Sequence, residues 1–250
     1  MITGIDLVDW QLQIAAGGRL PVEQQDVEMQ GHSIEVRIYA EDPTNGFMPQ
    51  TGELRLFEPD DGEGVRIDHG VYSGAVVSPY YDAMLAKVIA WGQTREEARR
   101  RLVRALKKTQ VLGLTTNKTF LVQLLSEPNF IKGDATTSFI DDALLSRLNT
   151  GITTLDYALA STVIQDNNNP LAGWSNAEPM LRSETYRTGS DGSCQQTFCR
   201  QTDTGFEVSV NDESIELMNV AFYQNQLTYT FNGVTRSACF AVWDDQVSID

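Results

Sequence analysis

The chain has 250 residues, enough for one large or two medium domains, each with a hydrophobic core of its own. Its 19 Lys and Arg residues are outnumbered by 34 Asp and Glu residues, which gives a formal net charge of -15. That balance argues against non-specific binding to nucleic acid or to anionic membranes. The sequence opens without a signal peptide and contains no run of about 18 apolar residues, which predicts a cytoplasmic protein with no membrane span.

The cysteine content predicts neither disulfide bonds nor a metal site. Cys194, Cys199 and Cys239 form no CxxC pair, and the chain holds only two histidines. Neither a set of disulfides nor a zinc site fits this inventory. We therefore expect reduced thiols in a reducing compartment and no metal site.

The first half alternates between helical and extended patterns. Residues 4–16 carry apolar side chains at helical spacing and end at two glycines, which predicts an amphipathic helix. Residues 32–40 switch to a period of two, typical of a half-buried strand. The runs 53–57 and 64–68 flank a turn-rich segment, which predicts a hairpin, and residues 84–91 predict a further strand.

Two helices are predicted next. Residues 95–109 start with a capping box of Thr94 and Glu97 and place small and leucine side chains on one side. A helix over 117–126 follows, with Asn117 as its cap. On an acidic chain the basic face of the first helix is more typical of a solvated surface than of a nucleic-acid interface. That face carries Arg95, Arg99, Arg100, Arg101, Arg104, Lys107 and Lys108.

A change in composition marks a domain boundary. A third helix is predicted at about 138–148, and the character changes at 149–151. Basic residues number 15 up to residue 150 and 4 beyond it, and acidic residues number 21 and 13. We expect one domain over residues 1–149 and a second over residues 150–250.

The second part starts with a helix and continues with strands. Residues 153–165 place Leu155, Leu159 and Val163 on one stripe. After Met180, six alternating segments are separated by turn clusters, one of which is the hairpin signal Asn232-Gly233. Strands spaced this closely typically close into a barrel or a sandwich. The predicted fold class is α+β, with a mostly antiparallel β domain followed by an antiparallel β-barrel centred on a helix.

No residue pattern specifies a reaction, but ordered blocks resemble a known family. GHSIEVRIYAEDP (31–43) is similar to the biotin carboxylase signature GHxxExRxxAEDP. Residues 1–142 as a whole resemble the C-terminal part of biotin carboxylases. The further blocks are FMPQTGELRLFEP, GVRID, VSPYYDAMLAKVIAWG, REEA and GLTTNKTFL.

The second part resembles, in pattern, a linker found in that family. In methylcrotonyl-CoA carboxylase and its geranyl-CoA relatives, a β-barrel wrapped on a helix follows the carboxylase and contacts the carboxyltransferase. The resemblance implies the α subunit of a hetero-oligomeric acyl-CoA carboxylase, a ligase that carboxylates biotin with ATP, bicarbonate and magnesium or manganese. The implied partners are the carboxyltransferase β subunit and the biotin carrier domain of the same subunit.

The resemblance also implies that this chain is an internal piece. In the family the ATP and metal sites precede the matched segment, and the biotin-accepting lysine follows it. Lys87, in DAMLAK, only superficially resembles that lysine. We therefore expect the chain alone to be inactive, to bind no ATP and to accept no biotin.

Arg37 is the catalytic and biotin-binding residue that the resemblance implies, with its guanidinium on the ureido oxygen of biotin. Its place on the polar face of strand 32–40 agrees, and a fixed positive charge suits the negative charge that develops on that oxygen. The alternative is a surface ion pair with Glu35, worth at most about 1 kcal/mol.

Other residues of the matched blocks receive no catalytic role. His32 is expected to be structural. Arg66 and Arg101 match subunit contacts of some family members, whereas Glu63 stands where that contact has an aromatic residue. By resemblance, three more residues line the same region: Tyr80, Tyr81 and Asp82.

Two hypotheses of function remain, with a distant third. The chain is part of a biotin-dependent ligase, or it is a catalytically inert interaction module whose barrel holds subunits together. A barrel that binds a small hydrophobic ligand is the third, and a helix that fills the barrel would exclude it. The acyl-CoA substrate is not specified by these residues, so propionyl-CoA and acetyl-CoA carboxylases stay open beside the methylcrotonyl-CoA and geranyl-CoA enzymes.

Overall fold

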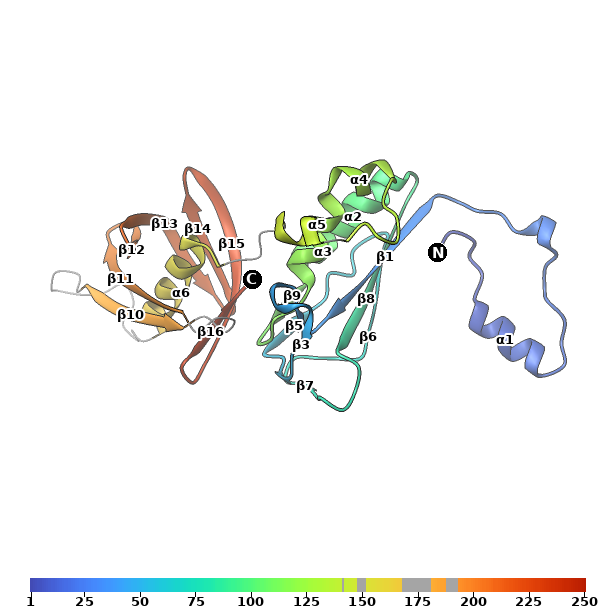
Figure 1. Cartoon of the computed structure of the whole chain (residues 1–250), viewed down its shortest axis with the longest axis horizontal. Coiled ribbons are helices and arrows are strands. Elements are labelled where there is room, and N and C mark those ends of the chain that lie inside the picture. Colours follow the sequence, from blue (N-terminus) through green and yellow to red (C-terminus); the bar gives the residue numbers. More distant parts are fainter. Residues whose placement is uncertain (141, 148–151, 168–180, 188–192) are drawn as a thin grey trace.

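Antiparallel strands dominate the fold, in agreement with the predicted α+β class (Figure 1). The structure is a computed structural model. It consists of an N-terminal arm, a first region around a three-stranded sheet and a second region around a seven-stranded sheet. The domain boundary expected at 149–151 lies outside the described residues, so the two-domain division stays a prediction. The structure describes residues 1–140, 142–147, 152–167, 181–187 and 193–250.

The N-terminal arm carries the first predicted helix, α1 (Leu7–Ala15). The carboxylate of Asp6 caps it by accepting bonds from two backbone N–H groups of the first turn, at 3.0 and 3.1 Å. None of its residues is buried, and its apolar side chains Leu7 and Leu12 are each 67% exposed. A short 3₁₀ turn, η1 (Gln24–Asp26), follows, and Figure 1 shows α1 standing away from the sheets.

The first region is built on three antiparallel strands in the order β1 (His32–Tyr39), β8 (Met84–Gly92) and β6 (Val65–His69). The alternation predicted for β1 is confirmed, because Ile38 and the following Ala40 are fully buried on one side. The helix α2 (Arg95–Lys108) packs on that side of the sheet. Four residues of α2 are buried on the side that faces the sheet: Ala98, Leu102, Ala105 and Leu106.

The basic face predicted on α2 is only partly exposed, which corrects the expectation of a solvated surface. Arg95 donates to the carbonyls of Phe130 and Ile131 at 2.7 and 2.9 Å, at the end of α4 (Pro128–Lys132). Arg99 donates to the carbonyl of Leu125 at 3.0 Å. These carbonyls lie at helix C-termini, where the last carbonyls have spare acceptor capacity and a cation is favourable. Part of the arginine face therefore fastens neighbouring helices.

The capping box predicted for α2 is half formed. The Thr94 hydroxyl accepts from the N–H of Glu97 at 3.2 Å, as expected. The Glu97 carboxylate accepts from the N–H of Gln93 at 2.8 Å, one residue before the expected partner. The helix start was therefore correct and one of its two bonds was displaced.

The hairpin predicted between residues 53–57 and 64–68 is wrong. β5 (Leu56–Glu58) pairs with β9 (Gln110–Leu112), and β6 pairs with β8. Both strands reach partners distant in sequence because Phe57 and Ile67 then pack on the same core, a gain that local turn chemistry does not provide.

Short elements complete the first region. β2 (Glu41–Asp42) pairs with β3 (Met48–Pro49), and β4 (Gly52–Glu53) pairs with β7 (Val76–Val77). The other two predicted helices are present. They are α3 (Lys118–Ser126) and the shorter α5 (Asp142–Arg147), and a 3₁₀ turn, η2 (Pro43–Asn45), connects β2 to β3.

The second region is a meander of seven antiparallel strands in chain order, one more than the six segments predicted. The sheet curls into a half-barrel (Figure 1). The predicted hairpin is confirmed: Phe231 pairs with Val234, and Asn232 and Gly233 take φ values of 51° and 74°. The strands are β10 (Arg182–Arg187), β11 (Cys194–Thr202), β12 (Gly205–Val210), β13 (Glu213–Tyr223), β14 (Gln226–Phe231), β15 (Val234–Trp243) and β16 (Gln246–Ile249).

The helix α6 (Thr154–Asn167) lies within the curl of this sheet (Figure 1). Every residue from 158 to 163 is buried, and six consecutive residues cover more than one helical turn. All sides of the helix are therefore enclosed there. Leu159 and Val163 are buried as predicted, at 3% and 1% exposure, and Leu155 is half-buried.

A small contact joins the two regions near β9. Leu56 and Leu112 of the first region form a buried cluster with Cys239 and Ala241 of the second. The buried ammonium of Lys118, at the start of α3, forms an ion pair with the last residue, Asp250, and donates to the carbonyl of Thr109 at 3.0 Å. The C-terminus accordingly lies between the two regions in Figure 1.

Candidate functional site

The face of the three-stranded sheet opposite α2 is polar and open to solvent. In β1 the side chains of Glu35, Arg37 and Tyr39 point to this face because they alternate with the buried set. The side chains of Arg37 and Glu35 are 58% and 41% exposed. Arg37, the predicted catalytic residue, thus lies where a ligand can reach it.

The surroundings of Arg37 stabilise its positive charge. The hydroxyl of Tyr39 and then the carboxylate of Glu35 raise the pKa of Arg37 above its ordinary value. Its Nε lies 3.5 Å from Oε1 of Glu35, so the ion pair weighed as the alternative is present. A pair this exposed contributes little, and a ligand that offers an acceptor can compete with it.

A row of charged side chains continues across the sheet from Arg37. Lys87 on β8 is the cross-strand partner of Arg37, and its Nζ lies 3.5 Å from Asp68 on β6. Asp68 also pairs with Arg66 at 2.8 Å, and Arg66 is the main cause that lowers the pKa of Asp68. Lys87 is therefore an ion-paired residue of the middle strand.

The loop before β8, the middle strand of the sheet, carries two exposed aromatic side chains. Tyr80 and Tyr81 are 89% and 84% exposed. The carboxylate of Asp82 accepts from the N–H of Met84 at 2.7 Å, which fixes the start of β8. Burial and then the charge of Asp82 raise the pKa of Glu41.

The residues proposed for a subunit contact do not share one environment. Arg66 is exposed, and so is Glu63. Arg101 is turned inward, where it pairs with Glu97 at 2.8 Å and donates to the carbonyl of Trp91 at 3.0 Å. His32 lies exposed at the start of β1. The contact itself stays a prediction.

Sequence reasoning missed the role of Asn117, which it treated as a helix cap. Its side chain makes no capping bond and instead binds β1, next to Arg37. Oδ1 accepts from the N–H of Tyr39 at 3.0 Å, and Nδ2 donates to the carbonyl of Arg37 at 3.2 Å. The only signal in the sequence was its place in the block GLTTNKTFL, because its partners lie about 80 residues earlier.

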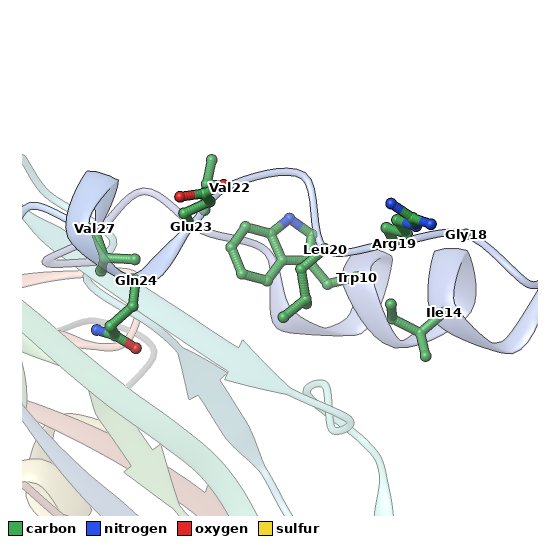
Figure 2. A pocket seen from close by; sticks show the side chains of 9 residues that line it. All are labelled: Trp10, Ile14, Gly18, Arg19, Leu20, Val22, Glu23, Gln24 and Val27. Atoms are coloured by element: carbon green, nitrogen blue, oxygen red, sulfur yellow. The ribbon is translucent and has the colours of Figure 1, made fainter.

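A shallow hollow of about 660 Å³ lies in the N-terminal arm, away from this face (Figure 2). Trp10 and Ile14 of α1 line it on one side, and Leu20, Val22 and Val27 of the following segment line it on the other. None of the residues around Arg37 lines it.

In the part of the chain that the structure describes, no group of three His, Cys, Asp or Glu residues could hold a metal ion. No described helix is long and apolar enough to cross a membrane.

A comparison with protein families identifies the region that carries Arg37. Residues 35–142 match the model of the biotin carboxylase C-terminal domain. This part of the chain is a biotin carboxylase C-terminal domain. Its matched residues run from Glu35 on β1 to the start of α5, and they include Arg37, Lys87 and Asn117.

Relatives of this biotin carboxylase domain belong to several carboxylases. A biotin carboxylase of Halalkalibacterium halodurans is 49% identical over 143 residues, which are 57% of this chain and 31% of that protein. The mitochondrial methylcrotonoyl-CoA carboxylase subunit alpha of Mus musculus is 33% identical over 274 residues, which cover 100% of this chain and 38% of that protein. The chain thus spans about a third of the length of these curated relatives.

The similar solved structures are also carboxylases or their biotin carboxylase domains. The biotin carboxylase domain of a thermophilic 2-oxoglutarate carboxylase bound to bicarbonate has 40% identity and a TM-score of 0.55, covering 56% of this chain and 31% of that one. The Rhizobium etli pyruvate carboxylase has 30% identity and a TM-score of 0.61, covering 76% of this chain and 20% of that one.

Proposed function

We propose that this chain supplies one wall of the site at which a biotin-dependent carboxylase carboxylates biotin. The observation that carries the proposal is the position of Arg37, exposed on the open face of a biotin carboxylase C-terminal domain. A guanidinium can only donate hydrogen bonds, so its natural partner is a carbonyl oxygen or an anion. The ureido oxygen of biotin is such an acceptor, which supports the proposal.

Arg37 acts by holding a positive charge at a fixed place. When bound, biotin supplies the nucleophilic ureido nitrogen, and ATP and bicarbonate supply the carboxyl group. Arg37 orients the ureido oxygen and stabilises negative charge that develops on it. The Tyr39 hydroxyl and the Glu35 carboxylate lie beside the guanidinium on this face and favour its positive charge. In this proposal ATP and magnesium or manganese are bound by other parts of the parent subunit.

We further propose that the parent is the α subunit of an acyl-CoA carboxylase, with methylcrotonyl-CoA as substrate. The alignment with the mouse methylcrotonoyl-CoA carboxylase subunit alpha supports this, because it covers the whole of this chain. The alignment with the biotin carboxylase of Halalkalibacterium halodurans covers only 57%. The proposed partners are the biotin carrier domain of the same subunit and a carboxyltransferase β subunit in a hetero-oligomer. Inactivity of the chain alone and a cytoplasmic location stay predictions.

The test replaces Arg37 in the full-length subunit and measures carboxylation of free biotin. Arg37→Ala should lower the rate by on the order of 10²–10³ and leave ATP binding unchanged, because one charge stabiliser is lost. Arg37→Lys should recover little of the rate, since an ammonium cannot reproduce the planar fork of donors.

Arg100→Ala is the matched control. Arg100 is another exposed arginine, 72% exposed, with a single 3.8 Å contact to Glu96 on α2, on the other side of the sheet. Its loss should not change the rate of biotin carboxylation. A wild-type rate in Arg37→Ala would show that the assignment of Arg37 is wrong.

The second candidate function, an interaction module, concerns residues 150–250. It is favoured by the enclosed helix: α6 occupies the interior of the half-barrel, so the outer surface is what remains for function. The same packing argues against a barrel that binds a small hydrophobic ligand. We propose that this surface docks the carboxyltransferase subunit.

A pull-down with the carboxyltransferase subunit tests the docking role. Residues 150–250 should retain the partner, and a shortened chain 1–149 should stay soluble yet lose it. The opposite pattern, with binding by 1–149 alone, contradicts the docking proposal and leaves the role of Arg37 untouched.

A further inference from the structure

The outer edge of β1 is bound by a side chain where a sheet would place another strand. β1 is an edge strand, and beside residues 37–39 its free edge faces Asn117. The backbone N–H of Asn117 donates to the carbonyl of Tyr39 at 3.1 Å. The side-chain amide accepts from Tyr39 N–H at 3.0 Å and donates to the Arg37 carbonyl at 3.2 Å. Three bonds from one residue thus replace a missing strand.

The pairing on the opposite edge of β1 is irregular at the same place. Arg37 pairs with Lys87 and Ile38 with Ala86, but Tyr39 pairs with Met84, so one residue of β8 is skipped. Such a bulge disrupts the ladder locally and bends the strand. The backbone at Arg37 therefore depends on Asn117 more than a regular strand would.

Because Asn117 is buried, its position requires a side chain that can make both of these hydrogen bonds. The residue is 6% exposed, so an amide group left without partners there would cost free energy. Among side chains of its length, only an amide offers one acceptor and one donor at the spacing of a backbone peptide. Its two partners, Arg37 and Tyr39, are the residues whose side chains meet on the open face.

We infer that Asn117 is a positioning residue for Arg37, a role that rests on the proposed function of Arg37 in biotin carboxylation. Asn117 fixes the backbone on either side of Ile38, and the guanidinium and the Tyr39 hydroxyl are thereby placed together. A displacement of about 1 Å in a reacting geometry can lower a rate about 100-fold. Asn117 contacts no substrate and acts only through β1.

The deciding experiment uses Asn117→Asp in the full-length subunit, with free biotin, ATP and bicarbonate as substrates. The carboxylate keeps the acceptor for Tyr39 but loses the donor and repels the Arg37 carbonyl. We expect kcat/KM for biotin to fall by about 10- to 100-fold, with ATP hydrolysis in the absence of biotin unchanged. The loss should shrink as the pH falls, because burial raises the pKa of the new carboxyl group and its protonated form donates again.

A double variant separates positioning from simple stabilisation. If Asn117 acts through Arg37, Arg37→Ala/Asn117→Asp should be no slower than Arg37→Ala alone, because the two effects are not additive. Thr109→Val is the matched control. Thr109 is fully buried and its hydroxyl accepts from the N–H of Asp60 at 3.2 Å, away from β1. It should lower stability without a selective loss for biotin.

The outcomes distinguish the inference from the function on which it rests. Wild-type biotin kinetics in Asn117→Asp, or equal losses toward biotin and ATP that add fully to Arg37→Ala, would overturn the positioning role alone. A wild-type rate in Arg37→Ala would overturn both. A selective, non-additive and pH-dependent loss supports both.

Discussion

The two regions use a β-sheet in opposite ways. In the first, α2 covers one face of the sheet and the other face stays open, with Arg37 exposed to solvent and Lys87 half-buried. In the second, the sheet curls around α6, and every residue from 158 to 163 is buried. The first region thus keeps a polar face at which a ligand can bind, while the second uses its inner face entirely for packing.

This difference indicates which surface of each region is available for chemistry or for binding. An open sheet face tolerates charged side chains because they stay hydrated, so a fixed arginine there costs little. A face that encloses a helix is mainly apolar, and the inner residues of the second region include Phe206, Val208, Leu217 and Leu227. Chemistry is therefore expected on the first sheet and surface recognition on the second.

The largest effect is expected from a charge placed inside the second region. Leu159→Asp should unfold this region, because it removes a leucine worth about 2–5 kcal/mol and strands a carboxylate among apolar side chains. Leu159 is 3% exposed. The first region should remain folded, which circular dichroism and limited proteolysis of the variant can establish.

Labelling of Cys199 gives a local readout of the same change. Burial raises the pKa of the Cys199 thiol to about 12, so at pH 8 it is protonated and unreactive in the folded protein. It should react in Leu159→Asp, where an exposed thiol has a pKa of about 8.5. Ile152→Asp, at a site 56% exposed just before α6, is the control and should leave Cys199 protected. Protection of Cys199 in Leu159→Asp would contradict the enclosed helix.

An intermediate effect is expected at the contact between the regions. Lys118→Met removes a buried ammonium from Asp250, whose Oδ2 also accepts from the N–H of Val111 at 3.4 Å. Breaking a buried pair on one side costs about 3 kcal/mol, which calorimetry would record as a lower melting temperature or as two separate transitions. Arg100→Met, which removes the exposed pair with Glu96, should cost less than about 1 kcal/mol. Equal effects of the two variants would show that the regions are not coupled through Lys118.

The smallest effect is expected at the Asn232-Gly233 turn. Gly233 has a φ of 74° and no atom near the position of an added Cβ, so Gly233→Ala acts only through backbone strain. It should destabilise the second region by about 1 kcal/mol, measured by urea denaturation. Gly70→Ala, which is also free of contacts but has no positive φ, should be neutral or slightly stabilising. A neutral Gly233→Ala would mean that the turn does not restrain the half-barrel.

Patterns of local period and capping were sufficient for much of this fold. The alternation in 32–40 placed Arg37 on the polar face of β1, because side-chain direction in a strand follows from a period of two. Apolar spacing located α2 and α6 within a residue or two, and Asn232-Gly233 specified its hairpin, because its φ values suit the twist of the strands. These features depend on neighbours in sequence.

Long-range contacts decided the rest. β5 and β6 were predicted to pair with each other, but they pair with β9 and β8 because the shared core outweighs a nearby turn. Asn117 looked like a helix cap, since its partners Arg37 and Tyr39 become neighbours only when α3 packs against β1. The sequence by itself thus determined which side chains of β1 face the core and that Arg37 stays polar and exposed. Only the tertiary structure decided what holds Arg37 in place, because those hydrogen bonds join residues brought together by the packing of the core.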